Sequence, residues 1–300
     1  MKTYLDCYPC FVRHALDASR LAGASEKEQD RVMRRVLAEL GRFDQGRSPP
    51  EMAYVVQQSV RHVTGQADPY REAKEASTRE ALSLYPELKR RVVEAVDPLE
   101  TAVRLAIAGN VIDLGIAPEY DLSGTIERVL EEPFAVNDLD AFRAEVKAAK
   151  SLLYLADNAG ETVFDRVLIE TLRLPLIYVV KSGPILNDAT RGDALEVGIG
   201  ELATIVETGS DAPGTILDHC SEGFVHLFAE AELIIAKGQA NYETLSDTAA
   251  PVFFLLQVKC GVTAKDLGVP VKSTVLKRAG KLECKLGPTL SGGPITVGQR

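Results

Sequence analysis

The chain has 300 residues, of which 46% are hydrophobic, and its formal net charge is −9 at pH 7. This length is enough for one large domain or two modest ones with a sizeable core. The acidic balance argues against a nucleic-acid-binding protein, because phosphate backbones are bound mainly by clustered Lys and Arg side chains.

Membrane insertion and secretion are not indicated either. No stretch approaches the roughly 18 to 20 uninterrupted apolar residues of a membrane-spanning helix, and the opening segment MKTYLDCYPC lacks an apolar signal-peptide core. The five cysteines form an odd, sparse set, unlike the dense, even sets of secreted disulfide scaffolds. We therefore expect a cytoplasmic protein with reduced thiols and without a membrane or nucleic-acid partner. The oligomeric state stays open.

The first part of the chain has the capping residues and the periodic apolar residues that are typical of helices. The segments SEKE, SPPE and DPLE each place a cap residue three positions before a glutamate, and the last two have proline at the first helical position. After Ser48 the apolar residues recur with a period of about 3.6 residues until Gly65. We predict an all-helical subdomain over residues 1–148.

From residue 149 to residue 300, short β-rich runs alternate with helix-length segments. The predicted strands are Leu152–Ala156, Leu174–Val180, Ala203–Glu207, Leu233–Ala236, Val252–Gln257 and Val269–Val275. Their spacing is typical of βαβ units, and their continuous apolar character is typical of parallel strands buried on both faces. The sequence therefore predicts an α/β domain with a mostly parallel sheet flanked by helices.

Polar loops follow four of these strands. Asp157 and Asn158 follow the first, and the segments KSGPILNDATRGD, TGSDAPGT and KGQANYETL follow the next three. Ligands of open parallel sheets bind outside the carboxyl ends of the strands, so we expect these loops to share one rim. Each loop alone is weak evidence, because such residues are ordinary in turns and an isolated Asp is often only a helix cap. Their common placement is the stronger signal.

The residue types of this rim suit a divalent cation and a phosphate. Carboxylate and carboxamide oxygens, as on Asp157, Asn158 and Asp188, favour Mg²⁺ or Mn²⁺. Lysines such as Lys237 suit a phosphoryl group. A bound cation lowers the pKa of water, while lysines and backbone N–H groups offset charge on phosphoryl oxygens. Phosphoester hydrolysis is therefore the leading prediction.

Five motifs appear in order along the chain: GNVIDLG, DNAGE, K-x5-NDAT-x2-D, KGQANYETL and LLQVKC. Together they resemble the DUF89, or ARMT1-like, family of damage-control phosphatases. The N-terminal CYPC and the KGQ variant resemble the prokaryotic branch of that family, since other branches read KGDLNY where this chain has Gln239. The resemblance extends from Cys7 to about Gly268.

The resemblance implies a helical N-terminal subdomain packed on a Rossmann-like three-layer α/β/α domain, with the active site in the cleft between them. It implies that Asp157, Asn158 and Asp188 are the catalytic metal ligands, with Mg²⁺, Mn²⁺, Co²⁺ or Ni²⁺ as the cation. The residues expected to contact the substrate phosphate or to support it are Asn110, Asp113, Glu161, Lys237, Asn241 and Lys259.

The implied activity is metal-dependent removal of phosphate from small phosphometabolites, such as sugar phosphates or damaged cofactor intermediates. We therefore predict a phosphomonoester hydrolase of metabolite damage control, whose partner is a small phosphorylated metabolite. The alternative is a non-catalytic metal- or metabolite-binding sensor that uses the same cleft together with Cys7, Cys10 and Cys260.

The cysteines form a candidate second site. Cys7 and Cys10 make a C-x-x-C motif at the start of a predicted helix, where the pKa of a thiol is lowered, and Cys260 is the third member. This trio is expected to bind a second metal, to act in redox chemistry, or to be simply buried, because a structural zinc site usually has four ligands. A thiol-dependent enzyme is the corresponding third alternative. The four histidines are too scattered for a histidine-based metal site, and His14 is expected on a polar helix face.

Overall fold

The computed structural model describes residues 1–111 and 122–280, so the predicted site residue Asp113 lies outside the described residues. The strands are β1 (Val136–Asn137), β2 (Leu152–Leu155), β3 (Leu176–Val180), β4 (Thr204–Glu207), β5 (Ile234–Lys237), β6 (Val252–Gln257) and β7 (Thr274–Arg278). The helices are α1 (Cys7–Leu21), α2 (Glu26–Leu40), α3 (Pro49–Thr64), α4 (Arg71–Glu94), α5 (Pro98–Ala108), α6 (Leu122–Glu131), α7 (Leu139–Ala148), α8 (Thr162–Leu172), α9 (Arg191–Glu196), α10 (Glu222–Glu230), α11 (Gly238–Leu245) and α12 (Gly261–Leu267). Within the described ranges, none of these helices has the length and apolar character needed to cross a membrane.

The strands form one sheet in the order β1-β7-β6-β5-β2-β3-β4. Strand β2 pairs in parallel with β3 and β5, and the pairs β3–β4 and β5–β6 are also parallel. Strand β7 runs antiparallel to β6 and pairs in parallel with β1. The prediction of a mostly parallel sheet is therefore confirmed, and the neighbouring strands β2, β3 and β5 end at the same edge.

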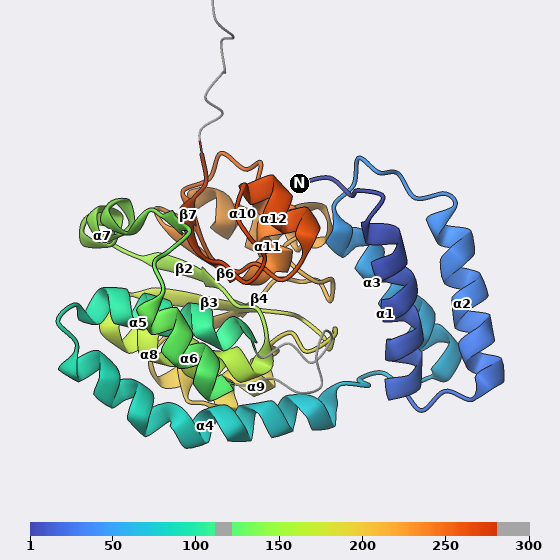
Figure 1. Ribbon diagram of the computed structural model, residues 1–300, viewed down its shortest axis with the longest axis horizontal. Coiled ribbons are helices and arrows are strands. Elements are labelled where there is room, and N and C mark those ends of the chain that lie inside the picture. Colours follow the sequence, from blue (N-terminus) through green and yellow to red (C-terminus); the bar gives the residue numbers. More distant parts are fainter. Residues whose placement is uncertain (112–121, 281–300) are drawn as a thin grey trace, which may run out of the picture.

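Helices cover both faces of the sheet. Along β2, Leu152 and Tyr154 pack in the hydrophobic core that includes helices α4 to α9, whereas Leu153 and Leu155 pack in the core that includes α10, α11 and α12. Figure 1 shows α10, α11 and α12 above the sheet and α4, α5, α6, α8 and α9 below it. This arrangement confirms the predicted three-layer α/β/α domain, and burial on both faces explains the continuous apolar runs of its strands.

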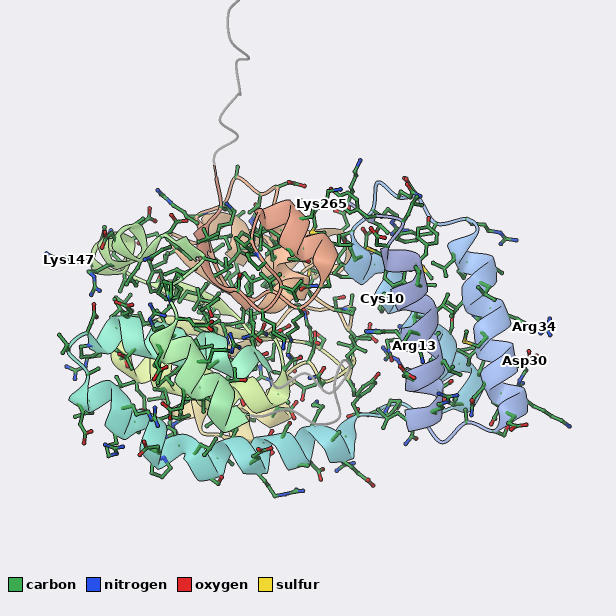
Figure 2. The ribbon with its side chains drawn as sticks, in the orientation of Figure 1. Cys10, Arg13, Asp30, Arg34, Lys147 and Lys265 are labelled. Atoms are coloured by element: carbon green, nitrogen blue, oxygen red, sulfur yellow. The ribbon has the colours of Figure 1, made fainter. Side chains whose placement is uncertain are left out.

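Helices α1, α2 and α3 form a helical subdomain with a hydrophobic core of its own, which includes Phe11, Val32 and Val56. In Figure 1 these three helices, in blue, lie to one side of the sheet. The charged side chains of Asp30 and Arg34 point outward from α2, on the side away from the sheet (Figure 2). The predicted N-terminal helical subdomain is thus confirmed in these helices.

The local capping signals that predicted the helix starts are present. Ser25 and Ser48 begin α2 and α3 with complete capping boxes, in which the glutamate three positions later reaches back to the backbone of the serine. At the start of α5, the Asp97 carboxylate accepts a hydrogen bond from the backbone N–H of Glu100 at 3.1 Å.

Two features differ from the predictions. The last strand begins at Thr274 rather than Val269, because Pro270 and Lys272, whose φ is 72°, place the apolar run in a turn before the strand. The two-residue strand β1 lies in a segment that was expected to be helical. Helices α4 to α7 share a core with the sheet, while the predicted division of the chain at residue 148 stays a prediction.

Candidate active site

The loops after β2 and β3 are joined by backbone hydrogen bonds. Asn158 and Asp188 form an antiparallel bridge. The backbone N–H of Ala189 donates to the Asp157 carbonyl at 2.7 Å, and that of Ala159 donates to the Asn187 carbonyl at 2.8 Å. The fold therefore brings Asp157, Asn158 and Asp188 together from two loops that are about 30 residues apart in the sequence.

Asp157 is seated against the first residue of α11. Gly238 adopts a φ of 78°, and a Cβ atom built on it would lie 1.8 Å from the Asp157 Oδ2 atom. No side chain fits in that space, and the left-handed backbone also favours glycine. The Lys-Gly-Gln segment thus needs its glycine in order to place the Asp157 carboxylate.

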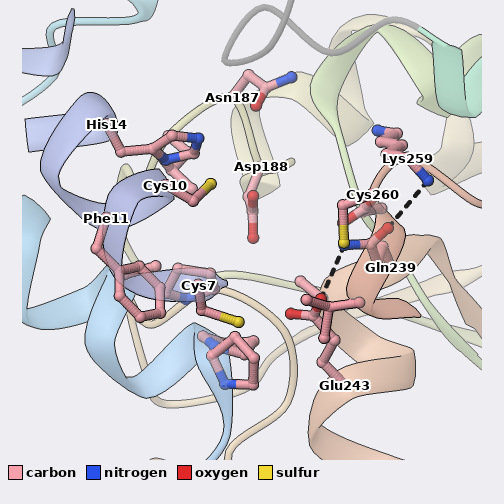
Figure 3. Close-up of a pocket in the computed structure, with 18 of the residues that line it drawn as sticks. Cys7, Cys10, Phe11, His14, Asn187, Asp188, Gln239, Glu243, Lys259 and Cys260 are labelled. Atoms are coloured by element: carbon pink, nitrogen blue, oxygen red, sulfur yellow. Dashed lines mark hydrogen bonds between the residues drawn. The ribbon is translucent and has the colours of Figure 1, made fainter. Parts of the chain in front are cut away.

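A cavity of about 460 Å³ lies where these loops face helices α1 and α3. Its polar lining includes Asp157, Asn158, Asn187, Asp188 and Lys259. Figure 3 shows the Asp188 carboxylate between Cys7, Cys10 and His14 of α1, on the left, and Gln239, Lys259 and Cys260, on the right. This volume is in the range of small-molecule sites, which are about 300 to 1,000 Å³.

Behind Asp157 and Asn158 lies a group of polar side chains, which we call the buried network: Asn110, Glu161, Asp165 and Lys237, with Tyr154 and Tyr178. Its members do not line the cavity. The amide nitrogen of Asn158 donates to Glu161 Oε1 at 2.6 Å and to Asp157 Oδ2 at 3.3 Å. The amide nitrogen of Asn110 donates to the same two oxygens, at 2.7 Å and 2.9 Å. Two amides therefore tie the Asp157 and Glu161 carboxylates together.

Lys237 neutralises part of the charge of this network. Its ammonium group, which is fully buried, donates to Glu161 Oε2 at 3.0 Å and to Asp165 Oδ1 at 2.6 Å. Burial lowers the pKa of Lys237, but the two carboxylates outweigh it and hold that pKa above its ordinary value. Lys237 therefore stays charged and paired in the interior.

Asp165 is held by two tyrosines as well as by Lys237. The hydroxyls of Tyr154 and Tyr178 donate to its two carboxylate oxygens, each at 2.7 Å. Burial, together with the neighbouring Asp165, raises the pKa of both tyrosines well above the ordinary value, so both remain hydrogen-bond donors. Sequence reasoning missed Asp165, although it lies four residues after Glu161 and therefore on the same face of a helix.

The structure separates the residues expected to contact phosphate. Lys259 lines the cavity, whereas Asn110, Glu161 and Lys237 belong to the buried network. Asn241 is also behind the cavity, where its amide nitrogen donates to the Ala156 and Lys237 carbonyls at 3.1 and 2.8 Å. Asn241 thus holds together the ends of β2 and β5.

The donor set of Asp157, Asn158 and Asp188 fits a hard divalent cation. The amide nitrogen of Asn158 is bonded to two carboxylates, so its oxygen faces away from them. The set then consists of two carboxylates and one amide oxygen, which are the ligand types of Mg²⁺ and Mn²⁺. In the described part of the chain no three His, Cys, Asp or Glu side chains gather into a metal-binding group, so this set depends on its asparagine.

The three cysteines line another part of the same cavity. The amide nitrogen of Gln239 donates to Glu243 Oε1 at 2.8 Å and to the Cys260 sulfur at 3.4 Å, and its oxygen accepts from the Lys259 N–H at 3.1 Å. Figure 3 shows two of these hydrogen bonds. Gln239 therefore holds the loop after β6 against α11. Burial raises the pKa of Glu243 to about 7.

The pKa values of the thiols at the start of α1 are raised, whereas a lowered pKa was expected at a helix N-terminus. Burial is the largest cause that raises the pKa of Cys7 and of Cys10 above the ordinary value, and the neighbouring Glu243 and Cys260 also raise it. The four cysteines in the described residues carry no disulfide bond. His14, which was expected on a polar helix face, lines the cavity instead; its position facing the sheet could not be read from the helical period alone.

Comparison with known proteins places this architecture in a family. The model of the damage-control phosphatase ARMT1-like domain matches residues 3–275. Damage-control phosphatase PH1575 of Pyrococcus horikoshii is 34% identical over 93% of this chain and 98% of its own length. A damage-control phosphatase of Archaeoglobus fulgidus is 35% identical over 75% of this chain and 81% of its own length. The crystal structure of the Pyrococcus horikoshii DUF89 family protein PH1575 superposes with a TM-score of 0.85 at 31% identity, covering 93% of this chain and 100% of that one.

Proposed function

Because the chain belongs to the damage-control phosphatase ARMT1-like family, we propose that it is a metal-dependent phosphomonoester hydrolase that acts on a small phosphorylated metabolite. The observation that carries this proposal is the meeting of Asp157, Asn158 and Asp188 in one cavity that also contains Lys259. The relatives named damage-control phosphatases support phosphatase activity. The cation and the metabolite are our proposal, and the cytoplasmic location stays a prediction.

Asp157, Asn158 and Asp188 would hold the cation. When bound, a divalent cation supplies Lewis-acid activation of water and of a phosphoryl oxygen. Both carboxylates reach the cavity from loops that the backbone hydrogen bonds hold together. The site therefore has the rigid support that a catalytic metal requires.

Other side chains, which do not line the cavity, hold the proposed metal ligands in position. Glu161 and Asp157 hold the amide nitrogen of Asn158, which turns the amide oxygen away from the interior. Lys237 holds Glu161, and Asp165 holds Lys237. We assign Glu161, Lys237 and Asp165 to positioning of Asn158. For Lys237 this role replaces the direct phosphate contact that the sequence suggested.

Lys259 supplies positive charge in the same cavity as the two aspartates, and Lys181 supplies it next to Asp188. Lys259 lines the cavity and can offset the charge of a phosphoryl group there. The Lys181 ammonium lies 3.6 Å from Asp188 Oδ2 and also donates to the Gly214 carbonyl. Lys181 is buried, so we assign it to holding the Asp188 carboxylate in place.

The test is recovery of hydrolysis by metal-stripped protein. We expect turnover of an aryl phosphate or a phosphometabolite to return when Mg²⁺, Mn²⁺, Co²⁺ or Ni²⁺ is added, and to stay absent in Asp157→Ala and Asp188→Ala. Asp218→Ala, at an exposed position outside the cavity, is the matched control. If ligands bind while no phosphomonoester in a broad panel is hydrolysed, the non-catalytic sensor is the better account.

A further inference from the structure

Asp193, the last residue of the K-x5-NDAT-x2-D motif, does not line the cavity and is not part of the proposed cation site. It lies in the first turn of α9, where it completes a capping box with Thr190. Asp193 Oδ2 accepts hydrogen bonds from the backbone N–H of Thr190 at 2.7 Å and from its hydroxyl at 2.6 Å. Thr190 comes two residues after Asp188. The capping box therefore holds the end of residues 187–190, which we call the Asp188 loop.

A lysine from a distant helix contacts the same carboxylate oxygen. The Lys74 ammonium group on α4 lies 2.8 Å from Asp193 Oδ2, and only 5% of the Lys74 side chain is exposed. Local preference does not favour this placement. Lys74 is the fourth residue of α4, near the helix start, where the helix dipole disfavours positive charge, and a lysine is almost never fully buried unless it is paired. The ion pair with Asp193 accounts for a buried lysine at this position.

The sheet holds the other side of the Asp188 loop. Lys181, the residue after β3, forms a parallel bridge with Thr190, and its backbone N–H donates to the Ala189 carbonyl at 3.0 Å. The Ala189 N–H in turn donates to the Asp157 carbonyl. Thr190 thus lies between the end of β3 and the Asp193 carboxylate. A shift of Thr190 would move the backbone of Asp188 and, through Ala189, its hydrogen bond to Asp157.

We infer that Lys74 is a positioning residue of the proposed cation site, which acts through Asp193 and Thr190 on the Asp188 loop. The inference rests on the proposed function, because it takes Asp188 to be a cation ligand. The competing account is that the Lys74–Asp193 ion pair only stabilises the fold. The two accounts differ in what Lys74→Met does, because only a positioning role adds faster opening of the loop and weaker metal binding to the loss of stability.

Two variants of the same helix are the controls for Lys74→Met. Leu88→Ala removes a fully buried side chain from the core, about 20 Å further along α4, and therefore lowers stability. Lys89→Met removes a lysine whose ammonium group lies 2.9 Å from a Glu170 oxygen. Urea unfolding gives the stability of each variant, so that effects on the loop can be compared with the loss of stability.

Amide hydrogen exchange tests the loop in metal-stripped protein. The measurement is mass spectrometry of a peptide that covers residues 187–193. We expect faster exchange of this peptide in Lys74→Met than in the wild type, because the capping box then opens more often. In Leu88→Ala and Lys89→Met the same peptide should exchange as in the wild type.

Calorimetric titration with Mn²⁺ tests the cation site. We expect binding to be about tenfold weaker in Lys74→Met, at the lower end of the effects of losing contacts that support metal ligands. Both controls should keep the wild-type affinity. In an Asp193→Asn background, Lys74→Met should add little further loss, because residues that act through one another do not have additive effects.

The outcomes separate the role of Lys74 from the proposed function. Wild-type loop exchange and Mn²⁺ affinity in folded Lys74→Met would overturn the inference and leave the proposed hydrolysis intact. Weaker Mn²⁺ binding in Lys74→Met, together with a wild type that hydrolyses no phosphomonoester, would support the inference and overturn the proposed hydrolysis. If Lys74→Met does not fold, Asp193→Asn takes its place, since it removes the paired charge and keeps the shape of the side chain. Wild-type exchange and affinity in that variant would equally overturn the inference.

Discussion

The amide nitrogen of Asn158 lies 2.6 Å from a carboxylate oxygen of Glu161. An ionised carboxylate can only accept hydrogen bonds, so the nitrogen end of the Asn158 amide must face Glu161 in the interior. The oxygen of Asn158 is consequently presented on the other side. The proposed metal ligand Asn158 is thus oriented by Glu161, a residue that does not line the cavity.

Glu161→Gln should weaken metal binding. The substitution replaces an acceptor of two amide donors and Lys237 with a group that is itself partly a donor, so Asn158 loses its fixed orientation. Loss of such supporting contacts typically reduces metal affinity by about 10- to 100-fold. Calorimetric titration with Mn²⁺ measures the change. The exposed Glu196→Gln is the control, and unchanged affinity in Glu161→Gln would show that the contact has no positioning role.

Lys237→Met should reduce stability as well as activity. It leaves Glu161 and Asp165 buried without their cation, and loss of one partner from a buried ion pair costs about 3–5 kcal/mol. Urea unfolding gives the change in the free energy of unfolding. The double variant Lys237→Met/Asp165→Asn removes one of the stranded charges and should recover part of the loss. A raised KM at unchanged stability would instead favour direct contact between Lys237 and the phosphate.

Gly238→Ala and Gly268→Ala are a matched pair. Both glycines have positive φ values, 78° and 70°, so both substitutions carry the strain of a left-handed alanine, about 1–2 kcal/mol. Only at Gly238 does the new methyl group collide with Asp157, whereas nothing lies within 4 Å at Gly268.

We expect turnover to fall on the order of 100-fold in Gly238→Ala, because small displacements of catalytic groups have effects of that size. Gly268→Ala should keep its turnover. Equal activity of the two variants, assayed with the same metal and phosphomonoester, would show that the close packing of Asp157 against Gly238 is not needed for turnover.

Glu243 should make stability depend on pH. Burial raises its folded-state pKa from 4.5 to about 7, while hydrogen bonds from Gln239 and Thr263 act in the opposite direction and the nearby Asp266 adds to the rise. The folded protein therefore holds this proton more tightly than the unfolded chain. The contribution is present below about pH 4.5 and is lost as the pH rises through about 7.

Comparison of wild type with Glu243→Gln isolates this effect. Between pH 4.5 and pH 8 the free energy of unfolding of the wild type should fall relative to the variant by on the order of 3 kcal/mol. Urea unfolding at a series of pH values provides the measurement. A difference that stays constant across this range would mean that Glu243 titrates normally in the folded state.

The periodicity of the sequence predicted much of the fold. The runs that became β2, β3, β5 and β6 are continuous and apolar, so strand positions and a parallel sheet followed from burial on both faces. The last strand was misplaced because an apolar run does not reveal a turn at Lys272. The two-residue strand β1 is too short to produce any pattern.

The position of the candidate site was predictable for residues whose place follows from the order of the strands alone. Asp157, Asn158 and Asp188 follow neighbouring parallel strands, so topology brings them to one edge. The burial of Lys237 was not predictable in the same way, because residue type does not show whether a lysine at a strand end faces the cavity or the interior. Its direction depends on Asp165, whose role becomes visible only when α8 is packed on the sheet.

The central claim is that two distant loops hold one cation through Asp157, Asn158 and Asp188. Calorimetric titration of the metal-stripped protein with Mn²⁺, in wild type, Asp188→Asn and the control Asp218→Asn, tests it most directly. We predict one tight site per chain in the wild type and the control, and loss of that site in folded Asp188→Asn. Undiminished Mn²⁺ binding by folded Asp188→Asn would contradict the account.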